Sequence, residues 1–154
     1  MVSRLLAVVV LLVGPVLAAH AETPAEACVR IGTDDATRAI PAELAPAVNA
    51  AFGMRMPAPV AVATTVFRCM DGHVLVCTAG ANLPCGKANT SRTPGAGAVE
   101  WCRGHADSGF VPAYVTGHDT IYDWRCRGGV PELAEQALTV DARGFIAQYW
   151  RTLP

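Results

Sequence analysis

The sequence predicts an α+β fold, in which a small antiparallel β-sheet is accompanied by short N-terminal helices and stabilised by disulfide bonds. Helix-capping and helix-ending residues are concentrated in residues 23–53. β-rich runs flank a turn sequence in residues 64–78, and similar runs return in the C-terminal third. Helices and antiparallel strands in separate parts of the chain are typical of this class. We expect about five strands, arranged as a hairpin plus a C-terminal meander.

Two short helices are predicted near the beginning of the chain. Thr23-Pro24-Ala25-Glu26 is a capping box with proline at the first helical position, and Gly32 ends that helix. A second helix runs from Pro46 to Phe52 and stops at Gly53. Pro41, together with the proline that opens the second helix, prevents one continuous helix through this region.

The next element is a β-hairpin. Two β-rich runs, residues 64–69 and 74–78, flank Met70-Asp71-Gly72-His73. Asp-Gly is a favoured centre for a two-residue hairpin turn. This turn pairs the methionine with the histidine and therefore places Cys77 opposite Val66.

Residues 79–119 are rich in glycine, proline and polar side chains, so most of this stretch is predicted to be loop. One helical turn, Ala98 to Arg103, interrupts the loop and ends at Gly104.

The C-terminal third has the pattern of a β-meander. Thr120 to Cys126 alternates in the manner of a strand, and Arg127-Gly128-Gly129 follows as a turn. Phe145 to Trp150 is predicted to be a further strand. Pro131 to Val140 also contains good helix formers. We favour a strand there, because Leu138-Thr139-Val140 runs straight into the turn before the last strand.

The N-terminus has the order of a secretory signal peptide. A short positive segment precedes the apolar run Leu5 to Val13, and Ala19-His20-Ala21 fits the cleavage pattern. A membrane anchor is the alternative, but the apolar stretch is interrupted by Gly14-Pro15 and is shorter than the roughly 20 residues that a span needs. We expect residues 1–21 to be cleaved and residues 22–154 to form a single exported domain, periplasmic or extracellular, with no membrane span.

The mature chain holds an even number of cysteines. In an exported protein such a set predicts three disulfides. A zinc site is the alternative, but it requires closely spaced ligand pairs, which this sequence lacks. We therefore expect no metal or other cofactor. The cysteines are Cys28, Cys69, Cys77, Cys85, Cys102 and Cys126.

Geometry restricts how these cysteines pair. The hairpin register separates Cys69 from Cys77 along the strands and places them on opposite faces, so this pairing is disfavoured. We expect Cys85–Cys102, because that bridge would hold a loop rich in glycine, proline and polar residues. Cys69–Cys126 is our second preference, since both cysteines lie at predicted strand ends. The remaining pairings stay open.

Three segments resemble parts of a known group of proteins. They are Val66-Phe67-Arg68-Cys69, Gly80-Ala81-Asn82-Leu83-Pro84-Cys85-Gly86-Lys87 and Thr116-Gly117-His118-Asp119-Thr120-Ile121-Tyr122. They are similar to segments of small exported cysteine-containing proteobacterial proteins of unassigned function, over roughly residues 60–150. The resemblance implies export and a disulfide-bearing fold, and it implies no activity and no catalytic residue.

Composition excludes two classes of protein. With 52% hydrophobic residues and a formal net charge of −1, the chain is unlike a disordered protein. It also lacks the basic excess with which proteins bind nucleic acid. No sequence motif names a reaction: Gly80 to Ala88 departs from the phosphate-binding loop, and Glu100 replaces the third glycine of a dinucleotide fingerprint.

The favoured function is that of a binding or inhibitor-type module that presents the loop 79–93. Its predicted binding residues are Asn82, Lys87, Asn89 and Arg92. A loop ordered in advance by a disulfide loses less conformational freedom when it engages a partner. The partner would be an envelope protein, a glycan or a small molecule.

A small hydrolase or metal-assisted enzyme is the alternative function. His118 and Asp119 would act as a general base and its orienting carboxylate, or would join His105 and Asp107 in a site. The competing interpretation is that Asp119 caps a turn and His118 is an ordinary loop histidine. Neighbouring residues of an extended chain also point apart, which makes these two poor partners unless the loop bends.

Overall fold

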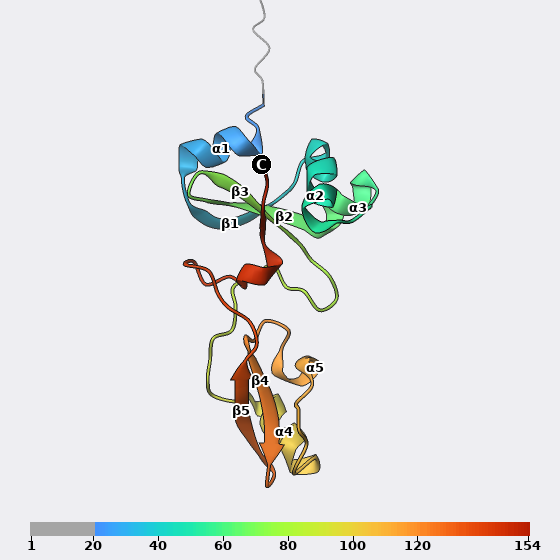
Figure 1. Cartoon of the computed structure of the whole chain (residues 1–154), viewed down its shortest axis with the longest axis vertical. Helices are drawn as coiled ribbons and strands as arrows, with labels where there is room; N and C mark the ends of the chain where they lie inside the picture. The colour runs from blue at the N-terminus through green and yellow to red at the C-terminus, as the bar shows by residue number, and fades with distance from the viewer. Residues whose placement is uncertain (1–20) are drawn as a thin grey trace, which may run out of the picture.

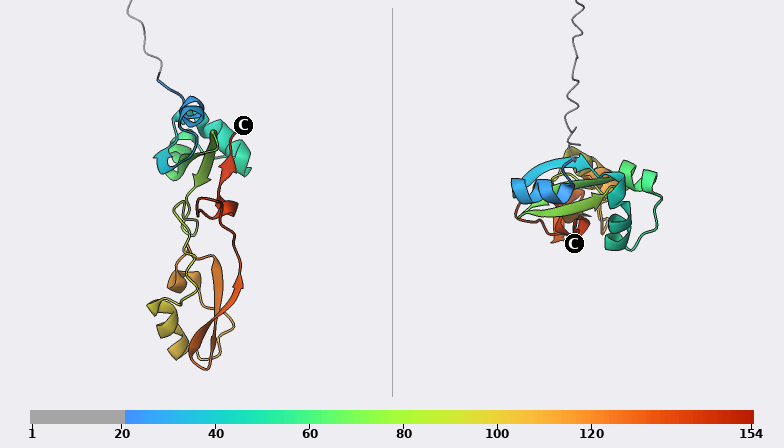
Figure 2. Two further views of the ribbon diagram at one scale, coloured as in Figure 1. Left: turned by 90° about the vertical axis from the view of Figure 1, so that its left-hand side faces the viewer. Right: turned by 90° about the horizontal axis from the view of Figure 1, so that it is seen from above.

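The computed structural model describes residues 21–154, and the predicted leader lies outside them except for Ala21. The α+β class is confirmed: short helices accompany antiparallel strands. The chain forms two lobes stacked along its long axis and joined by a narrow waist (Figures 1 and 2). None of the helices in the described part is long and apolar enough to cross a membrane.

The upper lobe, here the sheet lobe, contains a four-stranded antiparallel sheet in the order β1-β2-β3-β6. The β2/β3 register is confirmed, since Met70 pairs with His73 and Val66 with Cys77. Asp71 has a φ of 53°, as the predicted two-residue turn requires. The strands are β1 (Asp34–Ala39), β2 (Thr65–Met70), β3 (His73–Thr78) and β6 (Arg151–Thr152).

The helices of this lobe begin and end largely where the sequence predicts. Thr23 and Glu26 form the capping box of the first helix, and Gly32 ends that helix. The second helix ends at Gly53, which has a left-handed φ of 64°. The elements are α1 (Pro24–Ile31), η1 (Ala42–Leu44), α2 (Ala45–Phe52) and α3 (Ala58–Thr64).

Four elements of the sheet lobe were not predicted: η1, α3, β1 and β6. The sequence of β1 is polar and has no alternation of apolar and polar residues. It is a strand because its backbone pairs with β2, with Ala39 opposite Val66. Strand formation depends more on such context than on intrinsic preference.

The lower lobe, here the hairpin lobe, is built on a two-stranded sheet of β4 and β5. The strands meet at the predicted turn, where Arg127 pairs with Val130. A strand rather than a helix is confirmed for the contested segment, although the strand ends at Gln136. The elements are α4 (Ala96–Gly104), α5 (Ala113–Thr116), β4 (Tyr122–Arg127) and β5 (Val130–Gln136).

The predicted third strand of the meander, Phe145 to Trp150, is wrong. This segment leaves the hairpin lobe, forms the short helix η2 (Ala147–Tyr149) and leads into β6, which pairs with β3. Phe145 and Trp150 are buried in a cluster with Cys77 at the lower edge of the sheet lobe. Burial of these rings against the first sheet therefore outweighs local strand pairing.

Three disulfides are confirmed, with no free cysteine among the described residues, but both favoured pairings are wrong. Cys85–Cys102 and Cys69–Cys126 would each join parts of the chain that lie in different lobes. Instead, one bridge joins α1 to β2, one joins α4 to β4, and one ties the end of β3 to the loop that follows it. The pairs are Cys28–Cys69, Cys77–Cys85 and Cys102–Cys126, with Cα–Cα distances of 5.0, 5.8 and 5.3 Å. Cys69 and Cys77, whose pairing the hairpin register disfavours, each pair with another cysteine.

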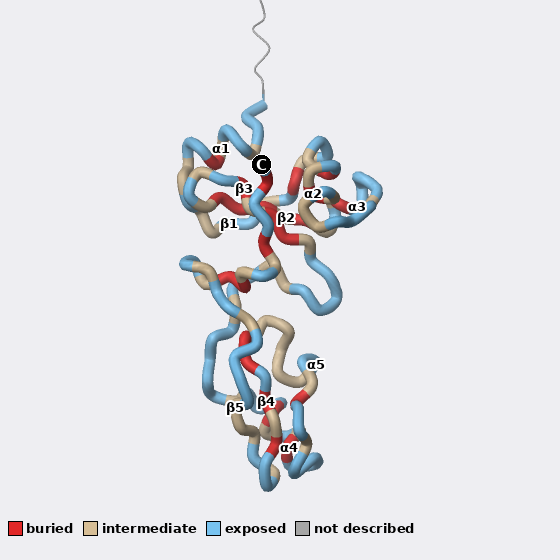
Figure 3. Tube along the Cα trace, viewed as in Figure 1, coloured by how far each residue is buried: buried red, intermediate tan, exposed pale blue. Residues whose placement is uncertain are grey.

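Each lobe has its own hydrophobic core (Figure 3). Cys69 and Val76 lie in the core of the sheet lobe, whereas Trp124 and Ile146 lie in that of the hairpin lobe. Two chain segments cross the waist between the lobes: the loop 79–93 and the return segment 137–150.

Candidate functional site

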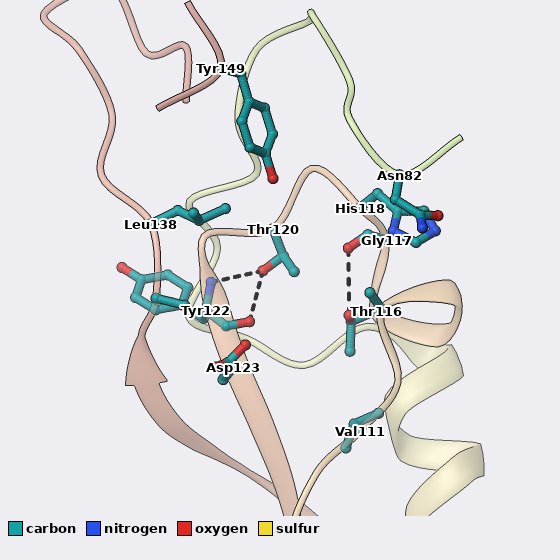
Figure 4. Close-up of a pocket in the computed structure, with 12 residues that line it drawn as sticks. Asn82, Val111, Thr116, Gly117, His118, Thr120, Tyr122, Asp123, Leu138 and Tyr149 are labelled. Carbon is teal, nitrogen blue, oxygen red and sulfur yellow. Dashed lines mark hydrogen bonds between the residues drawn. The ribbon is translucent and has the colours of Figure 1, made fainter. Parts of the chain in front are cut away.

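A cleft of about 300 Å³ lies at the waist of the molecule. Its walls come from four separate segments, as Figure 4 shows. Asn82 belongs to the loop 79–93, and Tyr149 belongs to η2 on the return segment. The remaining wall consists of the chain around α5 and the adjoining ends of β4 and β5. We call this site the waist cleft.

One side of the waist cleft is aromatic and aliphatic. Tyr122 is buried at the start of β4, and Leu138 lies beyond the end of β5. The Thr120 hydroxyl accepts a hydrogen bond from the backbone N–H of Tyr122 at 3.2 Å, which fixes the entry into the strand. The hydroxyl end of Tyr149 is directed toward the centre of the cleft in Figure 4.

The other side is polar. Asn82 and His118 lie next to each other with Thr116 further along the same wall, and Asp123 lies across the cleft on β4, beside Tyr122 (Figure 4). Considering only residues 21–154, the structure shows no hydrogen bond from the side chains of Asn82, His118 or Asp123, so these groups are free to bind a ligand.

The position of His118 depends on Gly117. This glycine ends α5 with a φ of 95°, a conformation that other residues rarely adopt. A Cβ atom at this position would also lie 2.6 Å from Oδ1 of Asp119. The Asp119 carboxylate therefore folds against the glycine, and the sharp corner turns His118 into the cleft.

The four predicted binding residues of the loop 79–93 have different roles. Only Asn82 lines the waist cleft. The side-chain oxygen of Asn89 accepts a hydrogen bond from the backbone N–H of Ser91 at 3.0 Å. The guanidinium of Arg92 lies 5.5 Å from the ring centroid of Tyr122. These two residues shape the loop and support the wall of the cleft from outside.

Lys87, the fourth predicted binding residue, anchors the loop. Its Nζ is 2.7 Å from Oδ2 of Asp35 and also donates to the carbonyl of Arg143. The same ammonium lies 4.3 Å from the ring centroid of Phe145. The loop is thus attached to β1 and to the return segment at once.

Asp35 is the centre of this anchor. Arg143 donates two hydrogen bonds to its carboxylate, both at 2.9 Å. These bonds, and then the bond from Lys87, hold the pKa of Asp35 far below its ordinary value. The carboxylate stays ionised and keeps three separate chain segments together.

The residues of the predicted enzyme site do not converge. His105 stacks on Trp101 with ring centroids 3.8 Å apart, and its Nδ1 lies 2.9 Å from the Trp101 carbonyl oxygen. It lines an apolar hollow beside α4 rather than the waist cleft. Asp107 accepts a hydrogen bond from the backbone N–H of Gly128 at 3.0 Å. In the part of the chain that the structure describes, no three histidine, cysteine or acidic side chains are grouped to hold a metal ion.

Sequence reasoning missed several residues of the cleft. Thr116, Tyr122 and Asp123 flank the predicted His118-Asp119 pair, so their nearness in the sequence was a usable signal. Tyr149 had no such signal, because it reaches the cleft only through the return of the chain to the sheet lobe.

Comparisons of the chain with known protein families, with curated proteins and with solved structures found no match.

Proposed function

We propose that this chain is an exported, disulfide-bonded binding protein and that the waist cleft holds its ligand. Two features support export: the leader pattern of residues 1–21, and three disulfides, which persist in oxidising compartments such as the periplasm or the extracellular space. The net charge of −1 gives no support to a nucleic-acid partner.

The observation that carries the proposal is the composition of the cleft. It joins the apolar side chains of Val111 and Leu138 to a few polar groups that are free to bind. Small-molecule sites commonly have this combination of an apolar wall and a small number of convergent polar side chains. A small molecule or one unit of a glycan fits a cleft of about 300 Å³.

The loop 79–93 contributes to binding mainly as a support. Cys77–Cys85 ties it to β3, and Lys87 ties it to β1. Asn82 lies inside the short loop that Cys77–Cys85 closes and is presented to the cleft from there. Ordering in advance reduces the conformational entropy that binding costs.

The enzyme hypothesis gains no support from the geometry. His118 lines the waist cleft. His105 instead stacks on Trp101, and Asp107 accepts a hydrogen bond from the turn at Gly128, both elsewhere on the hairpin lobe. General acid–base catalysis requires such groups to reach one reacting centre.

Titration followed by amide NMR tests the proposal. The probes are glucose, choline, acetate and phenol, which represent neutral polyhydroxyl, cationic, anionic and aromatic ligands. We expect at least one probe to shift the resonances of Asn82, His118 and Tyr149, and we expect Asn82→Ala and His118→Ala to abolish those shifts. His73→Ala is the matched control, because His73 is exposed on the β2/β3 turn of the other lobe. Shifts confined to other surfaces, or none with any probe, would contradict the proposal.

A further inference from the structure

The charges around the waist cleft restrict the class of its ligand. Asp123 is the only Asp, Glu, Lys or Arg among the described residues that line it. An anionic ligand would therefore meet a carboxylate and no neutralising cation. Placing such a charge in the cleft would cost desolvation energy without a compensating partner.

A cationic ligand meets a different obstacle. Tyr122 is a buried residue that lines the cleft at the start of β4, and the guanidinium of Arg92 already lies 5.5 Å from the centroid of its ring. The attraction of a ring for a cation is thus already used by a side chain of the protein itself. The positive charge of Arg92 would repel a second cation brought to the same ring.

The polar groups of the cleft match a ligand with many hydroxyl groups. The amide of Asn82 and the hydroxyls of Thr116 and Tyr149 can each both donate and accept hydrogen bonds. The two ring nitrogens of His118 add further hydrogen-bonding positions, and the Asp123 carboxylate accepts. A ligand hydroxyl, which also donates and accepts, can be satisfied by any member of this set.

The apolar wall has a counterpart in the same class of ligand. A pyranose ring has C–H faces as well as a rim of hydroxyls, and the side chain of Leu138 and the ring of Tyr149 supply apolar surface beside the polar groups. A volume of about 300 Å³ lies at the lower end of the range for small-molecule sites, which suits a single sugar unit.

We infer that the waist cleft binds a neutral sugar, free or as one unit of a glycan, with Asn82, His118 and Asp123 as its polar contacts. This inference rests on the proposed function, because it names the ligand class of that same site. Two charges favour a neutral ligand over a charged one: Asp123 disfavours an anion in the cleft, and Arg92 at the ring of Tyr122 disfavours a cation.

Sugars of one shape and different charge test the inference. Glucose, glucosamine and glucuronate share a pyranose ring and are neutral, cationic and anionic at neutral pH. Galactose, mannose and N-acetylglucosamine are titrated beside them to cover neutral stereochemistry. We expect at least one neutral sugar to shift the amide resonances of the cleft residues and to bind at least about tenfold more tightly than both charged sugars.

Two variants and one control locate the site. Asn82→Ala removes a hydrogen-bonding group, and Asp123→Asn replaces one of two acceptor oxygens by a donor, so each should weaken neutral-sugar binding by about tenfold or more. Thr90→Ala is the control, because Thr90 is exposed on the same loop and lies outside the cleft. We expect it to bind as the unaltered protein does.

The outcomes separate the two claims. If no neutral sugar binds, or if glucosamine or glucuronate binds most tightly, the sugar inference is overturned. If choline or phenol then shifts the cleft residues and Asn82→Ala abolishes the shift, the proposed binding function stands without it. If sugars bind but Asn82→Ala and Asp123→Asn have no effect, the ligand lies elsewhere and both claims are wrong.

Discussion

The guanidinium of Arg68 is completely buried on β2 and forms an ion pair with Asp141, a residue of the return segment. The guanidinium also lies over the rings of Phe145 and Trp150, at 4.1 and 4.5 Å from their centroids. Asp141 in turn accepts hydrogen bonds from the backbone N–H groups of Arg143 and Phe145 at 2.8 and 3.1 Å. This pair therefore attaches the return segment to the sheet and positions one side of the waist.

Replacing Arg68 by methionine should destabilise the protein by about 3–5 kcal/mol, because it leaves the Asp141 carboxylate without its partner in a mostly buried site. Arg68→Met with Asp141→Asn should recover part of that loss, since no unpaired charge remains. Urea unfolding of both single variants and the double variant measures the coupling. If the loss of unfolding free energy in the double variant equals the sum of the losses in the two single variants, the two side chains do not act as a pair.

The three disulfides should differ in their contribution to stability. Their sequence separations are 41 for Cys28–Cys69, 24 for Cys102–Cys126 and 8 for Cys77–Cys85. The chain-entropy relation gives about 4, 3.5 and 2.5 kcal/mol in that order. Paired Cys→Ser variants, compared by urea midpoint, check the ranking.

Removal of Cys77–Cys85 should have a further, local effect. Amide hydrogen exchange is expected to rise in residues 79–86, because the loop loses its tie to β3, while Trp124 on β4 stays protected. The double variant should also bind the cleft ligand more weakly, since Asn82 is no longer held in place. Uniform loss of protection across both lobes would contradict a local role for this bridge.

The anchor at Asp35 should make stability depend on pH. Arg143 and Lys87 lower the pKa of Asp35 in the folded protein, so the folded state binds this proton less readily than the unfolded state does. Its contribution is complete above the ordinary carboxyl pKa of roughly 4 and is lost as the pH falls toward the lower folded pKa. Asp35→Asn should therefore be less stable than the unaltered protein at pH 7, and the difference should shrink below about pH 4.

Thermal unfolding of both proteins across this pH range measures the effect. Glu43→Gln is the control, because Glu43 is an exposed carboxylate that forms no ion pair among the described residues. A stability difference between Asp35→Asn and the unaltered protein that is constant with pH would exclude the ion pairs as its cause.

Gly117→Ala should impair binding through backbone geometry. A φ of 95° and the close Asp119 carboxylate both oppose a side chain at this position. We expect a loss of about 1–3 kcal/mol in stability and weaker binding in the cleft, because the corner that presents His118 must move. Gly109→Ala, at a glycine with open space and ordinary φ, should change neither. Equal effects of the two substitutions would contradict this account.

Export is tested by mass. Produced with its leader in a secreting bacterial host, the protein should be recovered outside the cytoplasm without residues 1–21. Intact-mass analysis without reduction should also find three disulfides and no free thiol. Secreted protein that retains the leader would contradict cleavage after Ala21.

Local chemistry was enough to predict several elements. The capping box at Thr23 and the Asp71-Gly72 turn depend on residues close together in the sequence, and both are present in the structure. The even number of cysteines likewise predicted three disulfides. The polar strand β1 and the path of residues 145–150 were not predictable in this way, since each is set by packing against a distant strand.

The candidate site was also predictable only in part, from residue type and not from tertiary contacts. Asn82 and His118 were candidates because of their residue types, and both lie in the waist cleft. Lys87 was also a candidate by type, yet its charge is used against Asp35, more than fifty residues away in the sequence. A sequence shows which side chains could bind, but not which of them are already bound within the protein.

The sequence by itself determined the α+β class, the hairpin register and the oxidation of all six cysteines, because each follows from interactions between near neighbours or from composition. The tertiary structure decided the cysteine partners, the return of the chain to β3 and the convergence of Tyr149 with Asn82 at the waist. These features depend on which apolar surfaces bury one another, as Phe145 and Trp150 do with Cys77. Such burial joins residues that no local pattern relates, and so it can be seen only in the folded chain.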